Sequence, residues 1–255
     1  MQPKSIANDL VDRINEMQNG GSHFVDTSRL DAQSRAWRLL MREVEKLFAV
    51  DAQSAWELTG MLEGLRGDRD ATEAAFEKSL ALGISTSNRL NHMVNRLNLG
   101  LFSLAQRVYS EVGAPEGGNF CQMVENGFKA GAVFRAHQFA TRAQAMNLKW
   151  NDRDSLGRDL DEAVAILYSS GIDDEQIGRR LDLAGDILHR HRLKSRIRHS
   201  VINHPGDFVG VTYRLHVPAT PSETFNMNVE LAEAETAAGI VSDSTFEVVF
   251  EAISE

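Results

Sequence analysis

Apolar residues recur every three or four positions through most of the first 200 residues, which is the spacing of amphipathic α-helices. One stripe stops at the turn-forming residues 19–21, and its members are Leu10, Val11, Ile14 and Met17. The next stripe predicts a helix over about 28–50 with Asp26 or Thr27 as its N-cap. The members of this second stripe are Leu30, Trp37, Leu40, Val44, Leu47 and Phe48.

From residue 52 onward the helical pattern repeats. Residues 52–83 divide at Gly67-Asp68 into two short helices, and Trp56 and Gly60 on the first create a gap for a neighbour. The turn glycines Gly67, Gly100 and Gly131 are 33 and 31 residues apart. Residues 52–148 therefore resemble tetratricopeptide repeats, whose period is about 34 residues. The matching residues of the first unit are Trp56, Gly60, Gly67, Asp68, Phe76, Lys78, Leu80 and Leu82. The alternative is an irregular helical bundle.

Four asparagines lie on one face of a single predicted helix, since their spacings are three, four and three. In tetratricopeptide stacks the first helix of each pair lines a concave groove, where an Asn amide can hold a peptide backbone. The resemblance thus implies a protein-binding groove formed by Asn88, Asn91, Asn95, Asn98, Glu57, Met61, Glu125 and Lys129. The alternative is a solvated polar face.

Residues 171–197 resemble the helix-turn-helix of LuxR-like regulators and of the fourth region of sigma factors, with 156–169 as a supporting first helix. Gly178 occupies the close-approach position, Asp182 the turn, and Gly185 the start of the recognition helix. The resemblance implies contacts with double-stranded DNA by Arg179, Arg180, His189, Arg190, Arg192, Lys194 and Arg196. The alternative is a helix pair with a structural role.

The last fifty residues change character. Residues 210–217 and 245–252 are β-like runs, and between them 221–238 form a predicted capped helix. The expected fold is mainly α, with a tetratricopeptide-like stack, a trihelical helix-turn-helix-like unit and a small C-terminal α/β module. The expected segments are 1–50 (N-terminal helices), 51–150 (repeat stack), 151–200 (basic module) and 201–255 (acidic α/β module).

Charge is unevenly distributed along the 255 residues, whose net charge is −9. Residues 176–200 hold seven basic and two acidic residues, whereas 201–255 hold one basic and nine acidic residues. This distribution leaves two alternatives: the basic residues bind an external anion, or they bind the acidic module of the same chain. Under the second hypothesis the acidic module folds over the basic helix and competes with DNA. A single cysteine, no secretory signal and no membrane-length apolar run favour a cytoplasmic protein without membrane contact.

Enzyme motifs are absent from the sequence. It contains no phosphate-binding loop, no nucleophile elbow and no zinc-protease helix. His189 and His191 are two residues apart, so one helix cannot direct both at a metal. We expect no catalytic residues, cofactor or metal. An enzyme would be indicated only if His137, Glu125 and Cys121 met in a deep pocket.

The leading interpretation is a non-enzymatic regulator that binds a protein or peptide through its helical groove and DNA through its basic module. In outline it is similar to bacterial transcription regulators that join helical repeats to DNA-binding modules. The alternative is an interaction module without nucleic-acid binding: an adaptor, a secretion chaperone, or an immunity or antitoxin-type inhibitor. Either class is compatible with a homo-oligomer.

Overall fold

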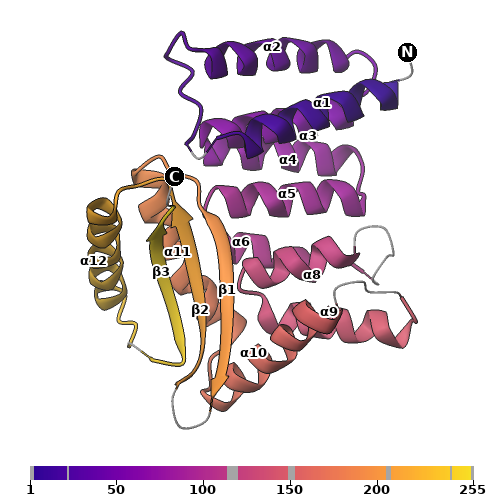
Figure 1. Ribbon diagram of the computed structural model, residues 1–255. Coiled ribbons are helices and arrows are strands. Elements are labelled where there is room, and N and C mark those ends of the chain that lie inside the picture. The colour runs from indigo at the N-terminus through magenta and orange to yellow at the C-terminus, as the bar shows by residue number, and fades with distance from the viewer. Residues whose placement is uncertain are drawn as a thin grey trace. The chain divides into compact units, whose positions relative to one another are not determined.

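The computed structural model describes residues 3–21, 23–113, 120–148, 153–204, 208–241 and 243–253 (Figure 1). By its contacts the chain divides into two compact units. The first comprises Met1–Leu99 with Arg192–Lys194, and the second comprises Gly100–His191 with Ser195–Glu255. The boundary after Leu99 falls within the segment 51–150 that the sequence pattern assigns to one stack.

The first unit consists of helices joined by short turns. They are α1 (Pro3–Asn19), α2 (Ala32–Leu47), α3 (Ala52–Arg66), α4 (Arg69–Leu82) and α5 (Thr86–Asn98). The N-terminal carboxylates of α2, α3 and α4 each accept a backbone N–H, and these caps are Asp31, Asp51 and Asp68. The expected cap of α2 at Asp26 or Thr27 is wrong, because the chain enters the helix only at Asp31. Leu30 consequently lies outside the buried stripe and is 84% exposed.

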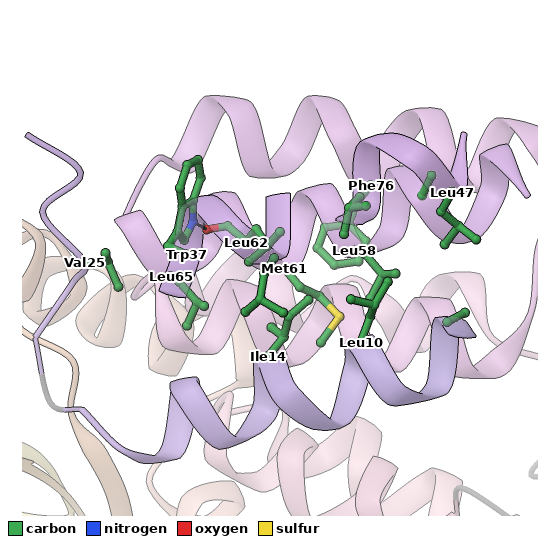
Figure 2. Packing of buried hydrophobic residues seen from close by; sticks show 14 residues of the cluster. Leu10, Ile14, Val25, Trp37, Leu47, Leu58, Met61, Leu62, Leu65 and Phe76 are labelled. Atoms are coloured by element: carbon green, nitrogen blue, oxygen red, sulfur yellow. Dashed lines mark hydrogen bonds between the residues drawn. The ribbon is translucent and has the colours of Figure 1, made fainter. Parts of the chain in front are cut away.

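The core of the first unit is built from the apolar faces of α1 to α4 (Figure 2). The predicted stripe on α2 is confirmed at Trp37, Leu40, Val44 and Leu47, all of which are buried. The indole Nε1 of Trp37 donates to the carbonyl of Leu62, 2.7 Å away, so its polar atom is satisfied inside the core. These contacts fix α2 firmly against α3.

The α3–α4 hairpin forms as the repeat pattern predicts. Gly67 has φ of 78°, which allows the tight turn between the two helices. A Cβ at Gly60 would lie 2.6 Å from the Phe76 ring, so the predicted gap is filled by that ring. Gly100 and Gly131 also have positive φ, at 70° and 76°, which confirms the other two predicted turns.

The second unit combines helices with a small sheet. Its helices are α6 (Phe102–Gln106), α7 (Val108–Glu111), α8 (Phe120–Lys129), α9 (Val133–Ala145), the π-helical turn η1 (Arg153–Gly157), α10 (Arg158–Ser169), α11 (Asp174–Arg190) and α12 (Pro221–Ala237). Helices α8 and α9 form a pair around the turn at Gly131. After Gly100 the chain forms the two short helices α6 and α7 in place of one longer helix.

The sheet has the order β1 (Arg196–His204), β2 (Phe208–Val217), β3 (Phe246–Ala252). Strand β2 pairs antiparallel with β1 and parallel with β3, and α12 is the crossover. The predicted small C-terminal α/β module is confirmed, and its second and third strands form a β-α-β unit with α12. The expectation that the basic stretch around residues 196–198 is helical is wrong. The run from 196 to 202 contains the β-branched residues Ile197, Val201 and Ile202, which favour a strand.

One face of this sheet is apolar and buried. Tyr213 and Leu215 of β2 and Phe246 and Phe250 of β3 belong to it. Strands β1 and β2 contact α10, and β3 contacts α11 and α12 (Figure 1). The Tyr213 hydroxyl donates to the Phe128 carbonyl at 2.6 Å, which ties the central strand to α8. The acidic C-terminal segment is therefore part of the core of the second unit and is no detachable tail.

Candidate functional site

The predicted helix-turn-helix does not form, because α11 is one continuous helix from Asp174 to Arg190. The carboxylate of Asp182, expected at the turn, accepts the Ser103 N–H at 3.0 Å and so satisfies the start of α6. A Cβ at Gly185 would lie 2.0 Å from the Gly100 carbonyl oxygen. Gly178 is a close-approach site as predicted, but its neighbours belong to α6. These residues dock other helices onto α11.

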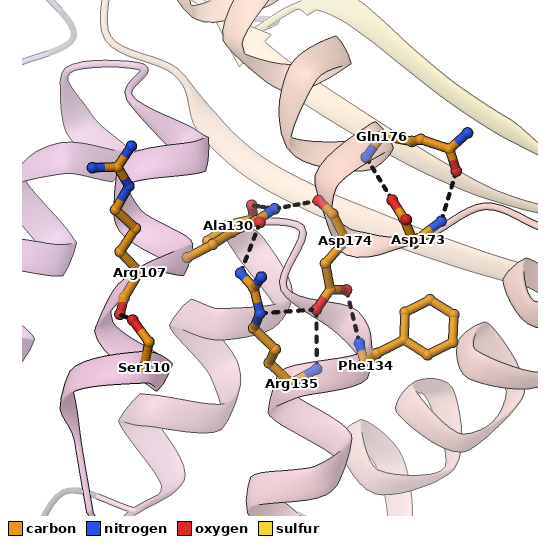
Figure 3. A network of polar contacts seen from close by, with 9 residues as sticks. Arg107, Ser110, Ala130, Phe134, Arg135, Asp173, Asp174 and Gln176 are labelled. Atoms are coloured by element: carbon orange, nitrogen blue, oxygen red, sulfur yellow. Dashed lines mark hydrogen bonds and ion pairs between the residues drawn. The ribbon is translucent and has the colours of Figure 1, made fainter.

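Asp174, at the start of α11, satisfies a helix terminus in the same way (Figure 3). Its carboxylate accepts the N–H groups of Phe134 and Arg135 at 2.9 and 3.1 Å, which satisfies the N-terminus of α9. Gln106 Nε2 donates to the carbonyls of Asp174 and Ala130. Burial raises the pKa of Asp174 although both N–H bonds act to lower it. The segment that resembles a helix-turn-helix thus has a structural role, because its carboxylates satisfy the N-termini of α6 and α9.

Several residues that were predicted to contact DNA bind other groups of the second unit instead. Arg180 donates to the carbonyls of Phe246 and Val241. Arg190 and His191 both bind the carboxylate of Glu230, at 3.0 and 2.9 Å. Burial acts to raise the pKa of Glu230, but its hydrogen bonds with His191 and Arg190 outweigh this and lower it. The acidic module therefore meets Arg190 and His191 at the end of α11, which is one of the two alternatives that the charge distribution left open.

The remaining predicted DNA contacts are spread over three segments. Arg192 has a φ of 56° and belongs with Lys194 to the first unit, whereas His189 is half-buried on α11 and Arg196 is exposed on β1. Lys194 is buried, and its Nζ donates to the Gln18 carbonyl at 3.2 Å. Its burial lowers the pKa to about 8. The prediction that Lys194 reaches a phosphate is wrong, because no phosphate can approach a side chain enclosed in this way.

The asparagine face packs inside the first unit. Asn91 donates to the carboxylate of Glu57 at 2.6 Å, and Asn95 donates to the Asn91 carbonyl. Asn95 Oδ1 lies so close to α3 that a Cβ at Gly64 would be 2.6 Å from it. Asn88 is buried, and its side chain accepts the N–H of Ser85, the N-cap of α5. Burial raises the pKa of Glu57, against the effect of the Asn91 bond.

The predicted peptide groove is therefore wrong at its central residues. Asn88 and Asn95 are buried, and Met61 points into the core (Figure 2). Asn98 is half-buried, and Glu125 and Lys129 form an ion pair of 2.6 Å on α8 in the second unit. Because α5 packs its asparagines against α3, no peptide can lie along them.

A different surface of the first unit is open and cationic. The side of α2 opposite its buried stripe carries Arg35, Arg38, Leu39 and Arg42, and with Leu30 and Asp31 these residues line a cleft of about 260 Å³. Leu30 and Leu39 are 84% and 50% exposed, so apolar area is accessible beside the arginines. Lys46 continues the exposed basic row by one further turn.

The carboxylates around this cleft are engaged elsewhere. Glu43 is bound by both terminal nitrogens of Arg13, at 2.7 and 2.8 Å, and hydrogen bonding to Arg13 lowers its pKa. Asp31 accepts the Ser34 N–H as the cap of α2. Arg38 is held by the Thr27 and Arg29 carbonyls. Arg35 and Arg42 form no ion pair with any residue that the structure describes, so their charges are available to a ligand.

This α2 surface has a signal in the sequence. Arg35, Arg38, Arg42 and Lys46 are spaced by three, four and four residues, which places them on one helix face. Net charge taken over long segments hides this signal, because the many acidic residues mask a short basic row.

Enzyme-like features do not assemble in the described part of the chain. There, no three His, Cys, Asp or Glu side chains come together as metal ligands. His137 pairs with Asp161 at 3.0 Å and Glu125 with Lys129 at 2.6 Å, and neither ion pair involves Cys121. None of the helices described is long and apolar enough to span a bilayer. No family model, curated protein or solved structure matches the chain.

Proposed function

We propose that the protein is a non-enzymatic binding protein that holds an acidic, leucine-rich segment of a partner protein on the outer face of α2. The observation that carries this proposal is the cleft itself. Two arginines without carboxylate partners among the described residues, Arg35 and Arg42, flank it beside two exposed leucines. Under this proposal the protein is an adaptor or an inhibitor rather than an enzyme.

The chemistry of the cleft favours carboxylates next to apolar side chains. Arginine binds a carboxylate through two parallel N–H···O bonds, which gives both affinity and orientation. Leu30 and Leu39 offer apolar area between the arginines, which a partner leucine can cover. Since α2 is anchored by Trp37 and Val44, the side chains start from a rigid helix and little ordering is needed on binding.

The overall charge favours a short acidic segment over a long polyanion. A net charge of −9 repels DNA and anionic membranes at long range, whereas a short peptide meets mainly the local field of α2. Binding of double-stranded DNA stays a prediction that the same experiment tests. The cleft also has a definite volume, which a side chain fills and a flat bilayer does not.

The test is fluorescence anisotropy of a labelled amphipathic peptide built from Glu and Leu, titrated with the full chain. Arg35→Glu with Arg42→Glu is expected to weaken binding by more than about tenfold, because attraction becomes repulsion. Arg107→Glu, on an exposed arginine of the second unit, is the matched control and should bind like the wild type. Circular dichroism checks that each variant is folded.

Three further ligands make the outcome decisive. The peptide with Lys in place of Glu should not bind. Duplex DNA and phosphatidylserine vesicles should bind more weakly than the acidic peptide at equal salt. Equal binding of the wild type and the α2 double variant would contradict the proposal, and tighter binding of DNA or vesicles would reassign the surface to that ligand.

A further inference from the structure

The second unit contains a pocket of about 370 Å³ where the C-terminal ends of α10 and α12 meet the first half of α11. Its volume lies at the lower end of the range of small-molecule sites in proteins. The described residues around it include both polar and apolar side chains from separate segments of the chain. Two of them, Arg179 and Arg180, are among the predicted DNA contacts.

The pocket is held in shape by hydrogen bonds. Arg180 bridges the carbonyls of Phe246 and Val241, and its guanidinium carbon lies 5.6 Å from the centre of the Phe246 ring. Asp243 accepts the Thr245 N–H at 2.7 Å, and the Ser170 hydroxyl is 3.2 Å from that of Thr245. These bonds connect the loop before β3 to α10 and α11, so the walls are formed without a ligand.

Arg179 is the charged side chain of the pocket whose N–H donors are available to a ligand. Its side chain is exposed and forms no ion pair with any described residue, unlike that of its neighbour Arg180. Gln176 lies one turn before it, and the Gln176 Oε1 accepts the Asp173 N–H at 2.9 Å. That bond leaves the amide nitrogen of Gln176 as a second donor beside the guanidinium.

The lining has one excess positive charge. Arg179 and Arg180 stand against Asp243, whose pKa is lowered by its hydrogen bonds with Thr245, so it stays ionised at neutral pH. Arg180 is already committed to two carbonyls, which leaves Arg179 to meet an anion. Glu235 is a further carboxyl near Arg180, and its pKa is raised by burial.

Part of the lining is apolar. It consists of Ile172, Ile240 and Val241, and Val241 is 82% exposed. Exposed branched side chains at the mouth of a preformed pocket are covered when an apolar ligand enters, which stabilises the complex. A purely ionic ligand such as phosphate would leave this part of the lining in water.

We propose that this pocket binds a small apolar monocarboxylate, with its carboxylate on Arg179 and Gln176 and its hydrocarbon body against Ile172, Ile240 and Val241. One negative charge matches the one excess positive charge of the lining. The site lies in the second unit and uses no residue of the α2 surface, so it stands or falls independently of the peptide-binding proposal.

The test is isothermal titration calorimetry of the full chain with sodium octanoate. Octanoate is expected to bind, and Arg179→Ala should weaken it about tenfold or more, which is the effect of losing one charge-assisted hydrogen-bond pair. Arg179→Lys keeps the positive charge but loses the two parallel N–H donors of the guanidinium. Its affinity for octanoate should therefore lie between those of the wild type and Arg179→Ala. Arg190→Ala is the control on the same helix, because Arg190 is bound by Glu230 and does not line the pocket.

Three control ligands separate the contribution of the carboxylate from that of the apolar body. Acetate lacks the apolar body, 1-octanol lacks the charge, and inorganic phosphate lacks both the apolar body and the planar carboxylate. All three should bind at least about tenfold more weakly than octanoate, since each loses a contact worth about 1.4 kcal/mol or more. No octanoate binding, or octanoate binding unchanged by Arg179→Ala, would overturn the proposal. Equal affinity for 1-octanol or for phosphate would overturn it as well.

Discussion

Helices α2 and α11 both carry clustered basic residues, yet they use them in different ways. On α11, Arg180 binds two carbonyls and Arg190 binds Glu230, so these charges serve the fold. On α2, Arg35 and Arg42 meet no carboxylate among the described residues. The difference shows that partners within the fold, rather than the number of basic residues, decide whether a charged helix can bind a ligand.

The two helices also differ in what surrounds them. α11 has glycines and aspartates on the faces that receive α6 and α9, such as Gly185 against Gly100 and Asp174 against Phe134. α2 buries one stripe and leaves its opposite side to the solvent. A change in these docking residues of α11 should therefore affect stability first, whereas a change on the outer face of α2 should affect binding alone.

Gly185→Ala should have the largest effect. In an isolated helix alanine would be favoured by about 1 kcal/mol. Here its Cβ would lie 2.0 Å from the Gly100 carbonyl oxygen, and the resulting overpacking should lower the free energy of unfolding by about 2–3 kcal/mol. Urea denaturation measures this. Gly113→Ala is the control, because a Cβ there meets nothing within 4 Å. Equal stability of the two variants would contradict the structural role of α11.

Glu73→Gln tests a partly buried ion pair in the first unit. Glu73 binds His92 and Arg96, and although burial acts to raise its pKa, these bonds hold the pKa at about 2. A carboxylate whose folded pKa lies below its unfolded value stabilises the fold at neutral pH, and this contribution is lost as the pH falls through the folded pKa. The variant should be roughly 2–3 kcal/mol less stable at pH 7.

The pH series separates this pair from other effects. The stability difference between wild type and Glu73→Gln should shrink as the pH falls from about 5 toward 2, because the wild-type carboxyl becomes protonated. Glu77→Gln, on the exposed side of the same helix, should show no difference at either pH. A difference that stays constant with pH would show that packing rather than charge is responsible.

Arg190→Ala and Arg42→Ala compare a paired with an unpaired arginine directly. The Arg190–Glu230 pair is largely exposed, so its loss should lower stability by at most about 1 kcal/mol. Arg42→Ala should change stability by less than about 0.5 kcal/mol, since no described contact of its charge is lost. Thermal unfolding of both variants at low and high salt measures this. A larger loss for Arg42→Ala would mean that its charge already serves the fold.

Local features of this fold could be predicted from the sequence. The turns at Gly67 and Gly131 follow from glycine's freedom at positive φ, and the β2-α12-β3 unit follows from β-branched runs around a capped helix. These signals depend on neighbours in sequence. They required no knowledge of which elements meet.

The sites could not be predicted in the same way, because distant partners decide them. Asn95 looked like a groove residue, but Gly64 on another helix provides the space that it fills. Asp182 looked like a turn residue, but Ser103, far away in sequence, uses its carboxylate. The basic residues from Arg35 to Lys46 could be recognised from their helical spacing, but averaging the charge over long segments concealed them.

The most direct test of the central claim is a pair of single charge reversals, one on each helix. Arg42→Glu and Arg179→Glu both alter exposed arginines without an ion pair among the described residues. In anisotropy titrations with the Glu- and Leu-based peptide, Arg42→Glu should weaken binding by about tenfold and Arg179→Glu should leave it unchanged. Equal loss in both variants, or loss only with Arg179→Glu, would contradict the assignment of the binding surface to α2.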